Sequence, residues 1–195
     1  MTLVVADITM SLDGYVTGPD PDLEHGLGRG GEPLHRWAFS DDPVDVDQLR
    51  TGTERSGAVI MGRRLFDIID GPGGWDDDVG YGAGEVGTPP FFVVTHAVPA
   101  TRRLELDFTF VLDGVASAIE QGRTVAGAKD VVIMGGGQVI AQALDAGLVD
   151  ELHLHLAPMV LGDGTPLWQD VGRIEMRQLD VQVSPTATHL TFAIG

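Results

Sequence analysis

Short apolar runs rich in β-branched residues recur along the chain and predict strands. The runs cover residues 3–9, 58–61, 91–95, 108–112 and 131–134, and turn residues bound each of them. Continuous apolar runs of this length are typical of strands that are buried on both faces of a sheet. The pattern therefore predicts a central sheet made of these five segments.

Two segments between the runs have helical spacing instead. Apolar residues recur one turn apart in residues 114–125 and 138–146, at Val115, Ala118, Ile119, Gly122, Val139, Ile140, Ala143 and Leu144. This spacing gives each segment one apolar stripe that can face a sheet. Because strands and helices alternate, the sequence predicts an α/β fold whose sheet is mainly parallel and flanked by helices.

The last quarter of the chain has a different pattern. Residues 151–157 predict a further strand, and residues 174–183 and 186–194 predict two more on either side of Ser184-Pro185. Proline at a turn favours a reversal of the chain. We therefore expect an antiparallel C-terminal hairpin.

Two long stretches, residues 17–32 and 71–90, have little regular pattern and are crowded with Gly, Pro and Asp. Loops of this length are either functional lids or disordered surface. Neither is typical of a domain linker, because apolar strands continue on both sides. Since 195 residues suit one ordinary domain, we expect residues 1–195 to form a single domain.

Composition narrows the class of partner. The chain has 12 Lys and Arg against 29 Asp and Glu, a formal net charge of −17, which repels phosphate backbones and anionic bilayers. It has no cysteine, which excludes disulfides, thiolate metal sites and a cysteine nucleophile. No apolar run approaches the roughly 18 residues of a membrane helix. We expect a cytoplasmic protein that binds a small molecule, with no nucleic acid or membrane partner and no metal.

A first candidate phosphate site follows residues 58–61, where Gly62, Arg63 and Arg64 precede an apolar helical start. Helix N-termini offer unpaired N–H groups, and arginine adds a planar fork of donors. The alternative is that these are two surface arginines on an acidic protein.

Two further strand ends suit the same ligand chemistry. Gly135, Gly136 and Gly137 join a strand to a helix and allow close approach of an anion, although a tight turn alone explains them as well. Thr95 and His96 end the run at residues 91–95 and offer a hydroxyl and an imidazole, or Thr95 only caps the next segment of the chain.

In order, these segments resemble the dihydrofolate reductase-like superfamily, and more closely its branch related to the C-terminal reductase domain of bacterial riboflavin biosynthesis. The motifs that carry the resemblance span nearly the whole chain: Ser11-Leu12-Asp13-Gly14-Tyr15-Val16, Val59-Ile60-Met61-Gly62-Arg63-Arg64, Val93-Val94-Thr95-His96, Gly135-Gly136-Gly137, Leu148-Val149-Asp150-Glu151-Leu152 and Leu161-Gly162-Asp163-Gly164. The resemblance implies a three-layer fold, NADPH bound across the strand ends, and hydride transfer to a small heterocyclic, imine or carbonyl substrate.

The resemblance also implies which residues bind the cofactor. Gly62, Arg63 and Arg64 match the segment that holds the adenosine-side phosphates, and Thr95 and His96 match the pair near the ribose 2′-phosphate. The residues that match the pyrophosphate loop and the surroundings of the nicotinamide are Gly135, Gly136, Gly137, Gln138 and Val139, and Thr9, Val16 and Thr17, respectively.

The substrate end departs from the folate-reducing relatives, which place an acidic residue near the start of the second segment's helix. Here the matching position falls at or near Pro33 or Leu34, with Glu32 as the neighbouring acid. Dihydrofolate is therefore not the expected substrate. Asp41 and Asp42 lie beyond this helix and are expected to be solvated.

Candidate substrate and proton-donor residues follow from the same comparison. His155 matches a polar position of the substrate pocket, and Glu32, His155 and ordered water are the proton donors that we expect. His153 and His155 share one face of a strand, which also fits a half-solvated sheet face, a subunit contact or, weakly, a metal pair. Asp13 is a turn former or a substrate contact, and Trp37 and Phe39 either line the pocket or belong to the core.

Alternative functions remain open. A non-catalytic ligand-binding module of the same fold explains the missing acid, and a reductase that uses another hydride carrier, such as a deazaflavin, is a third interpretation. Relatives in this branch commonly pair, so we expect a homodimer through residues 174–194.

Overall fold

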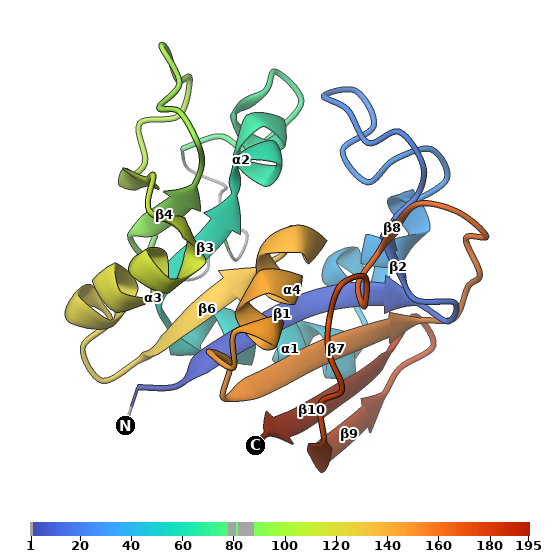
Figure 1. The fold of residues 1–195 in the computed structure, drawn as a ribbon. Helices are drawn as coiled ribbons and strands as arrows, with labels where there is room; N and C mark the ends of the chain where they lie inside the picture. Colours follow the sequence, from blue (N-terminus) through green and yellow to red (C-terminus); the bar gives the residue numbers. More distant parts are fainter. Residues whose placement is uncertain (1, 78–80, 82–87) are drawn as a thin grey trace.

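An eight-stranded sheet forms the centre of the protein (Figure 1). The structure is a computed structural model that describes residues 2–77, 81 and 88–195. The strands of the sheet, in chain order, are β1 (Val4–Ser11), β3 (Ser56–Gly62), β4 (Phe91–Val94), β5 (Phe108–Val111), β6 (Asp130–Met134), β7 (Glu151–Ala157), β9 (Met176–Val183) and β10 (Thr188–Ile194). They lie side by side in the order β5-β4-β3-β6-β1-β7-β10-β9.

The six strands from β5 to β7 are parallel, and β10 runs antiparallel to both β7 and β9. The predicted parallel sheet and C-terminal hairpin are therefore confirmed. The edge strand β9 is largely exposed, and pairing of two chains through it stays a prediction.

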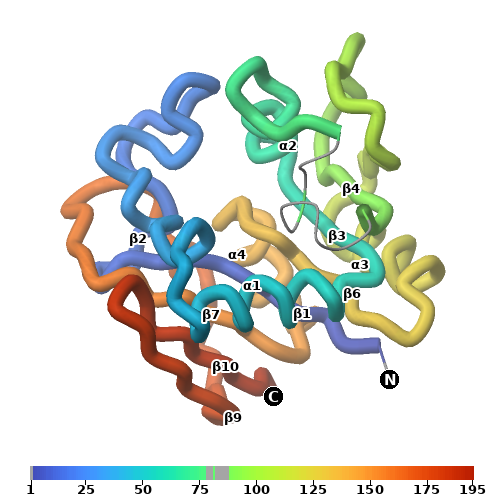
Figure 2. The backbone as a smooth tube through the Cα atoms, turned by 180° about the vertical axis from the view of Figure 1, so that it is seen from behind, coloured from blue at the N-terminus to red at the C-terminus, as the bar shows by residue number. Residues whose placement is uncertain are grey.

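Helices cover both faces of the sheet (Figures 1 and 2). On one face lie α3 (Gly114–Val125) and α4 (Gly137–Asp145), and on the other lie the 3₁₀ helix η1 (Glu32–Phe39), α1 (Pro43–Arg55) and α2 (Arg63–Asp70). Alternation along β3 explains the arrangement, because Ala58 and Ile60 point into one core and Val59 and Met61 into the other. The helices and the sheet form the three predicted layers.

The sequence pattern did not predict α1. Its buried positions are the polar residues Asp45 and Thr53, so it has no apolar stripe. The signals that remain are Pro43 in the first turn and the N-cap Asp42, whose carboxylate accepts a hydrogen bond from the Val44 N–H at 2.9 Å. Asp42, which we expected to be solvated, is half-buried and caps α1.

The chain between β1 and η1 is ordered by its own backbone. It begins with β2 (Tyr15–Thr17), which pairs with β8 (Thr165–Pro166). The Gly18 N–H then donates to Leu27 O at 2.7 Å, and a Cβ atom on Gly28 would lie only 2.2 Å from Gly18 O. Disordered surface is thus the wrong alternative for residues 17–32. The corresponding prediction for residues 71–90 falls partly on residues outside the described ones. Among the described helices, none combines the length and apolar character needed to cross a membrane.

Candidate active site

Turns that are far apart in sequence meet at the carboxyl end of the sheet. A Cβ atom on Gly136, between β6 and α4, would lie 3.6 Å from the backbone nitrogen of Gly62, between β3 and α2. A Cβ atom on Gly137 would lie 2.8 Å from Val16 Cγ2 on β2. A Cβ atom on Gly62 would lie 2.9 Å from Val139 Cγ2. At Gly62 and Gly137, side chains larger than hydrogen would therefore push these segments apart.

The backbone of this meeting point is shaped for close approach by a ligand. Gly135 and Gly136 have φ angles of +75° and +80°, which glycine adopts at little cost. Gly137 begins α4 and Gly62 precedes α2, and neither helix start has a side-chain cap. Two helix N-termini without a side-chain cap thus lie side by side, an arrangement that favours anions. We call Gly62, Gly135, Gly136 and Gly137 the glycine cradle.

Arg63 and Thr95 are also brought together beside the glycine cradle. The Arg63 guanidinium donates to Ala97 O at 2.7 Å and to Thr95 Oγ1 at 3.4 Å, and its Nε donates to Asp67 at 2.7 Å. The side chain of Arg63 is 35% exposed and is held by these bonds. By contrast, Arg64, His96 and Gln138 are exposed.

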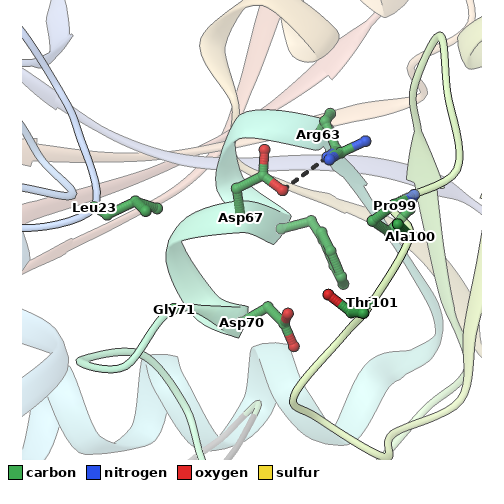
Figure 3. A pocket seen from close by; sticks show the side chains of 9 residues that line it. Leu23, Arg63, Asp67, Asp70, Gly71, Pro99, Ala100 and Thr101 are labelled. Atoms are coloured by element: carbon green, nitrogen blue, oxygen red, sulfur yellow. Dashed lines mark hydrogen bonds and ion pairs between the residues drawn. The ribbon is translucent and has the colours of Figure 1, made fainter.

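A concavity of about 480 Å³ lies next to Arg63 (Figure 3). Leu23, α2 and the segment around Pro99 line it, and the carboxylates of Asp67 and Asp70 face it. These two acids make its wall unsuitable for a phosphate, so the concavity by itself does not mark the anion site.

The residues that we expected near the nicotinamide lie in two different places. Val16 is buried against Gly137, and the Thr17 hydroxyl is 2.9 Å from that of Thr165 on β8. Thr9 instead lies under η1, where its hydroxyl accepts a hydrogen bond from the indole Nε1 of Trp37 at 2.8 Å.

A chain of four polar side chains lies between the sheet and η1 and α1. Asp7 Oδ1 is 3.1 Å from His155 Nε2, and the two Nδ1 atoms of His155 and His189 are 2.7 Å apart. His189 Nε2 is 2.8 Å from Asp45 Oδ1. The two histidines and Asp45 are buried, while 29% of the Asp7 side chain is exposed. We call these four residues the His–Asp chain.

Asp7, one end of the His–Asp chain, lies on the strand next to the one that leads into the glycine cradle. Asp7 is paired in register with Met134 on the neighbouring parallel strand, and Met134 immediately precedes Gly135. Adjacent strands are about 4.8 Å apart, and paired side chains share a face. The turn that begins at Gly135 and a titratable group that reaches solvent therefore lie on neighbouring strands.

The sequence profile of the RibD C-terminal domain family matches residues 2–190. The chain belongs to this family. An uncharacterized Bacillus subtilis protein, YyaP, is 22% identical over 186 residues, which cover 92% of this chain and 87% of YyaP.

Solved structures share the RibD-like fold. A protein of Shewanella sp. PV-4 provisionally assigned to riboflavin biosynthesis superposes with a TM-score of 0.72 at 20% identity, covering 100% of this chain and 99% of that one. A Thermotoga maritima diaminohydroxyphosphoribosylaminopyrimidine deaminase/5-amino-6-(5-phosphoribosylamino)uracil reductase superposes with a TM-score of 0.62 at 14% identity, covering 100% of this chain and 57% of that one. This RibD C-terminal domain therefore spans about half of the longer deaminase/reductase.

The sequence did not predict three residues of the His–Asp chain, Asp7, Asp45 and His189, as site residues. Asp7 is the one charged residue within the apolar run of residues 3–9, and that interruption was a usable signal. Asp45 and His189 carry no such signal, because α1 and β10 have mixed patterns. The expectation of a half-solvated face is wrong for His155, which is 4% exposed.

Other predicted substrate residues have distinct positions. Trp37 is buried and stacks on His155 with ring centroids 4.0 Å apart. Phe39 is 88% exposed, so its assignment to the core is wrong. Glu32 is exposed in the first turn of η1. No cluster of three or more potential ligands within the described ranges could hold a metal ion.

Asp13 links the turn after β1 to the segment after β7 through hydrogen bonds. Its carboxylate accepts hydrogen bonds from Ser11 Oγ at 2.7 Å and from the N–H groups of Leu161 and Gly162 at 3.1 and 2.7 Å. The hydrogen bond from Ser11 is the largest influence, and together these bonds lower the pKa of Asp13 from 3.8 to about 2. This explains how the segment after β7 is held against the turn after β1.

The low pKa of Asp13 predicts a pH-dependent contribution to stability. A carboxylate with a lowered pKa stabilises the fold above its unfolded pKa and loses this effect as pH falls through the folded value. The difference in free energy of unfolding between wild type and Asp13→Asn should therefore be constant from about pH 6 to 7. This range provides the internal control. It should shrink between about pH 4 and pH 2. Chemical denaturation at each pH measures it, and a difference that grew with acid would contradict the assignment.

Proposed function

We propose that this RibD C-terminal domain protein is an NADPH-dependent reductase that transfers a hydride to a small heterocyclic, imine or carbonyl substrate. The observation that carries the proposal is the glycine cradle, in which the turns before α2 and α4 meet at one end of the sheet. Membership of the RibD C-terminal domain family supports a reductase, since the T. maritima relative has a reductase in its name.

The residues present fit a dinucleotide with several phosphates. Gly135 and Gly136 need positive φ angles, so the turn suits backbone contact with a ligand. The N–H groups at the start of α4 would hold the pyrophosphate. Arg63 would add a charged donor beside Thr95. When bound, the cofactor supplies the hydride.

The protein's own residues would align the substrate and supply a proton. Asp7 is the part of the His–Asp chain that reaches solvent, and its register with Met134 places it next to the glycine cradle. Proton transfer requires a titratable group close to the reduced atom. We therefore assign the proton-donating end to Asp7 and His155 rather than to Glu32, which is exposed on η1.

Cofactor binding is the first test of this function. We expect fluorescence titration of NADPH to give a Kd no weaker than about 100 μM. Arg63→Ala should weaken binding by at least about 1 kcal/mol, or about fivefold, because it removes a charge-assisted donor beside the cradle. The matched control is Arg50→Ala, which removes the same charge from an exposed position on α1 and should leave the Kd unchanged.

Three outcomes would contradict the proposal. Titration without saturation at millimolar protein would exclude NADPH as the cofactor, and a deazaflavin competitor would then test another hydride carrier. Equal loss of affinity in the two arginine variants would show that only net charge matters. Tight NADPH binding without oxidation over a panel of pterins, flavin precursors and simple ketones would favour the non-catalytic binding module.

A further inference from the structure

The His–Asp chain contains three hydrogen bonds, and each needs one proton. They join Asp7 to His155, His155 to His189, and His189 to Asp45. Two neutral imidazoles supply only two ring protons. With two protons, one of the three contacts would press two acceptors together, at a site where an unsatisfied polar group is costly. The distances are therefore satisfied by three protons.

Both terminal groups are carboxylates that favour the ionised form. Burial raises the pKa of Asp45, but hydrogen bonds from Thr186, Ser184 and His189 outweigh this effect and leave it lowered. Burial likewise raises the pKa of Asp7, and the charge and hydrogen bond of His155 again leave it lowered. Ionised carboxylates can only accept hydrogen bonds, so the Nε2 atoms of His155 and His189 each carry a proton. The third proton lies between the two Nδ1 atoms.

The surroundings of His155 and His189 accommodate one added positive charge on the two rings but not two. The Trp37 ring lies over His155 and meets His189 edge-on, with centroids 4.0 and 5.2 Å away, and an indole face attracts a cation. Burial is the largest influence on His189 and, with the charge of His155, leaves its pKa lowered, while the hydrogen bond to Asp45 and the charges of Asp45 and Asp7 oppose this effect. Two imidazolium ions 2.7 Å apart would repel each other strongly.

We propose that Asp7, His155, His189 and Asp45 form a buried proton relay that holds one proton more than two neutral histidines and delivers it through Asp7 to the substrate. The delivery step rests on the proposed hydride transfer. In this arrangement His189 and Asp45, which lie behind His155, are positioning residues that keep the added proton in place. Asp7 is the group that meets the reacting molecule, and His155, which is 4% exposed, passes the proton to it.

The transfer balances without any further reactant. The shared proton moves from His189 Nδ1 to His155 Nδ1 as the proton on His155 Nε2 moves to Asp7 Oδ1. Asp7 then gives this proton to the substrate atom that has gained electron density from the hydride. The chain is left with two protons, and His155 Nε2 faces the Asp7 carboxylate without one. This unfavourable contact is relieved when Asp7, which is partly exposed, takes up a proton from solvent.

Other titratable groups surround the relay and shape its pH dependence. On β7, His153 lies 3.2 Å from Glu151 and its charge acts on Asp7. On η1, loss of hydration lowers the pKa of His35, and the charge of His155 lowers it further while Asp7 raises it. Burial and the charge of Asp7 raise the pKa of Tyr81, which bonds Ser56. Among the described residues, His155 and His189 are the only pair of directly bonded imidazoles.

Nitrogen-15 NMR of histidine-labelled protein without cofactor tests the relay directly. We expect three of the four ring nitrogens of His155 and His189 to be protonated from about pH 6 to pH 8, with His155→Gln and His189→Gln used to assign the signals. Two protonated nitrogens over this range would overturn the relay. The number of protonated ring nitrogens in the wild-type protein tests the relay even where a variant fails to fold.

Asp45→Asn provides the second measurement. It keeps an acceptor for His189 but removes the charge that holds the added proton, so the pair should lose this proton at a pH at least about one unit lower than in wild type. Asp47→Asn is the matched control on the same helix, because Asp47 is exposed and bonds Arg50. An unshifted titration in Asp45→Asn, or an equal shift in both variants, would overturn the role of Asp45.

Failure of the relay and failure of the proposed function give different results. Two protons in a protein that binds NADPH would overturn the relay and leave the reductase proposal intact. Three protons in a protein that does not bind NADPH would overturn the proposed function, and the delivery step with it.

Discussion

Replacing Trp37 by alanine is expected to lower the free energy of unfolding by about 3 to 5 kcal/mol, the range for removing a large buried aromatic side chain. The indole is 7% exposed, donates to Thr9 at 2.8 Å, and packs against the rings of both His155 and His189. Its loss leaves a cavity beside two polar rings. Urea denaturation monitored by circular dichroism measures the change.

Two variants separate the causes of this loss. Trp37→Phe keeps most of the packing and loses the indole N–H, so a smaller cost of about 1 to 2 kcal/mol is expected. Trp168→Ala is the surface control, because that residue is 38% exposed, and its cost should stay below about 1 kcal/mol. Similar losses in Trp37→Ala and Trp168→Ala would contradict the assignment of Trp37 as the cover of the His–Asp chain.

Gly136→Ala is expected to weaken NADPH binding by at least tenfold, or about 1.4 kcal/mol. Gly136 has φ +80°, and its missing side chain keeps open the space beside Gly62. A Cβ atom at this position holds a phosphate away from the backbone N–H groups that would bind it. The positive φ angle adds about 1 to 2 kcal/mol of folding cost.

Gly127→Ala is the matched control for this variant. Gly127 also has a positive φ angle, +64°, but a Cβ atom there meets nothing within 4 Å. Both variants should lose similar stability in thermal unfolding, and only Gly136→Ala should lose affinity in the NADPH titration. Equal affinity in the two proteins would show that the glycine cradle does not bind the cofactor.

Local patterns determined most of the sheet and little of the irregular region. The predicted helix at residues 114–125 coincides with α3, and the predicted strand at residues 151–157 coincides with β7, because burial on a sheet imposes apolar periodicity on the sequence. The helix α1 escaped prediction because its buried side is polar. Asp45 can be buried there because Thr186 and His189, more than 140 positions later, donate to it.

The sequence by itself determined the α/β architecture, the C-terminal hairpin and the glycine-rich turns, because strand periodicity and the freedom of glycine are properties of neighbouring residues. The tertiary structure decided which turns meet and which acid lies beside His155. Asp7 and His155 become partners only because β1 and β7 lie side by side. Hydrogen bonds between residues far apart in sequence depend on packing, and no local pattern records them.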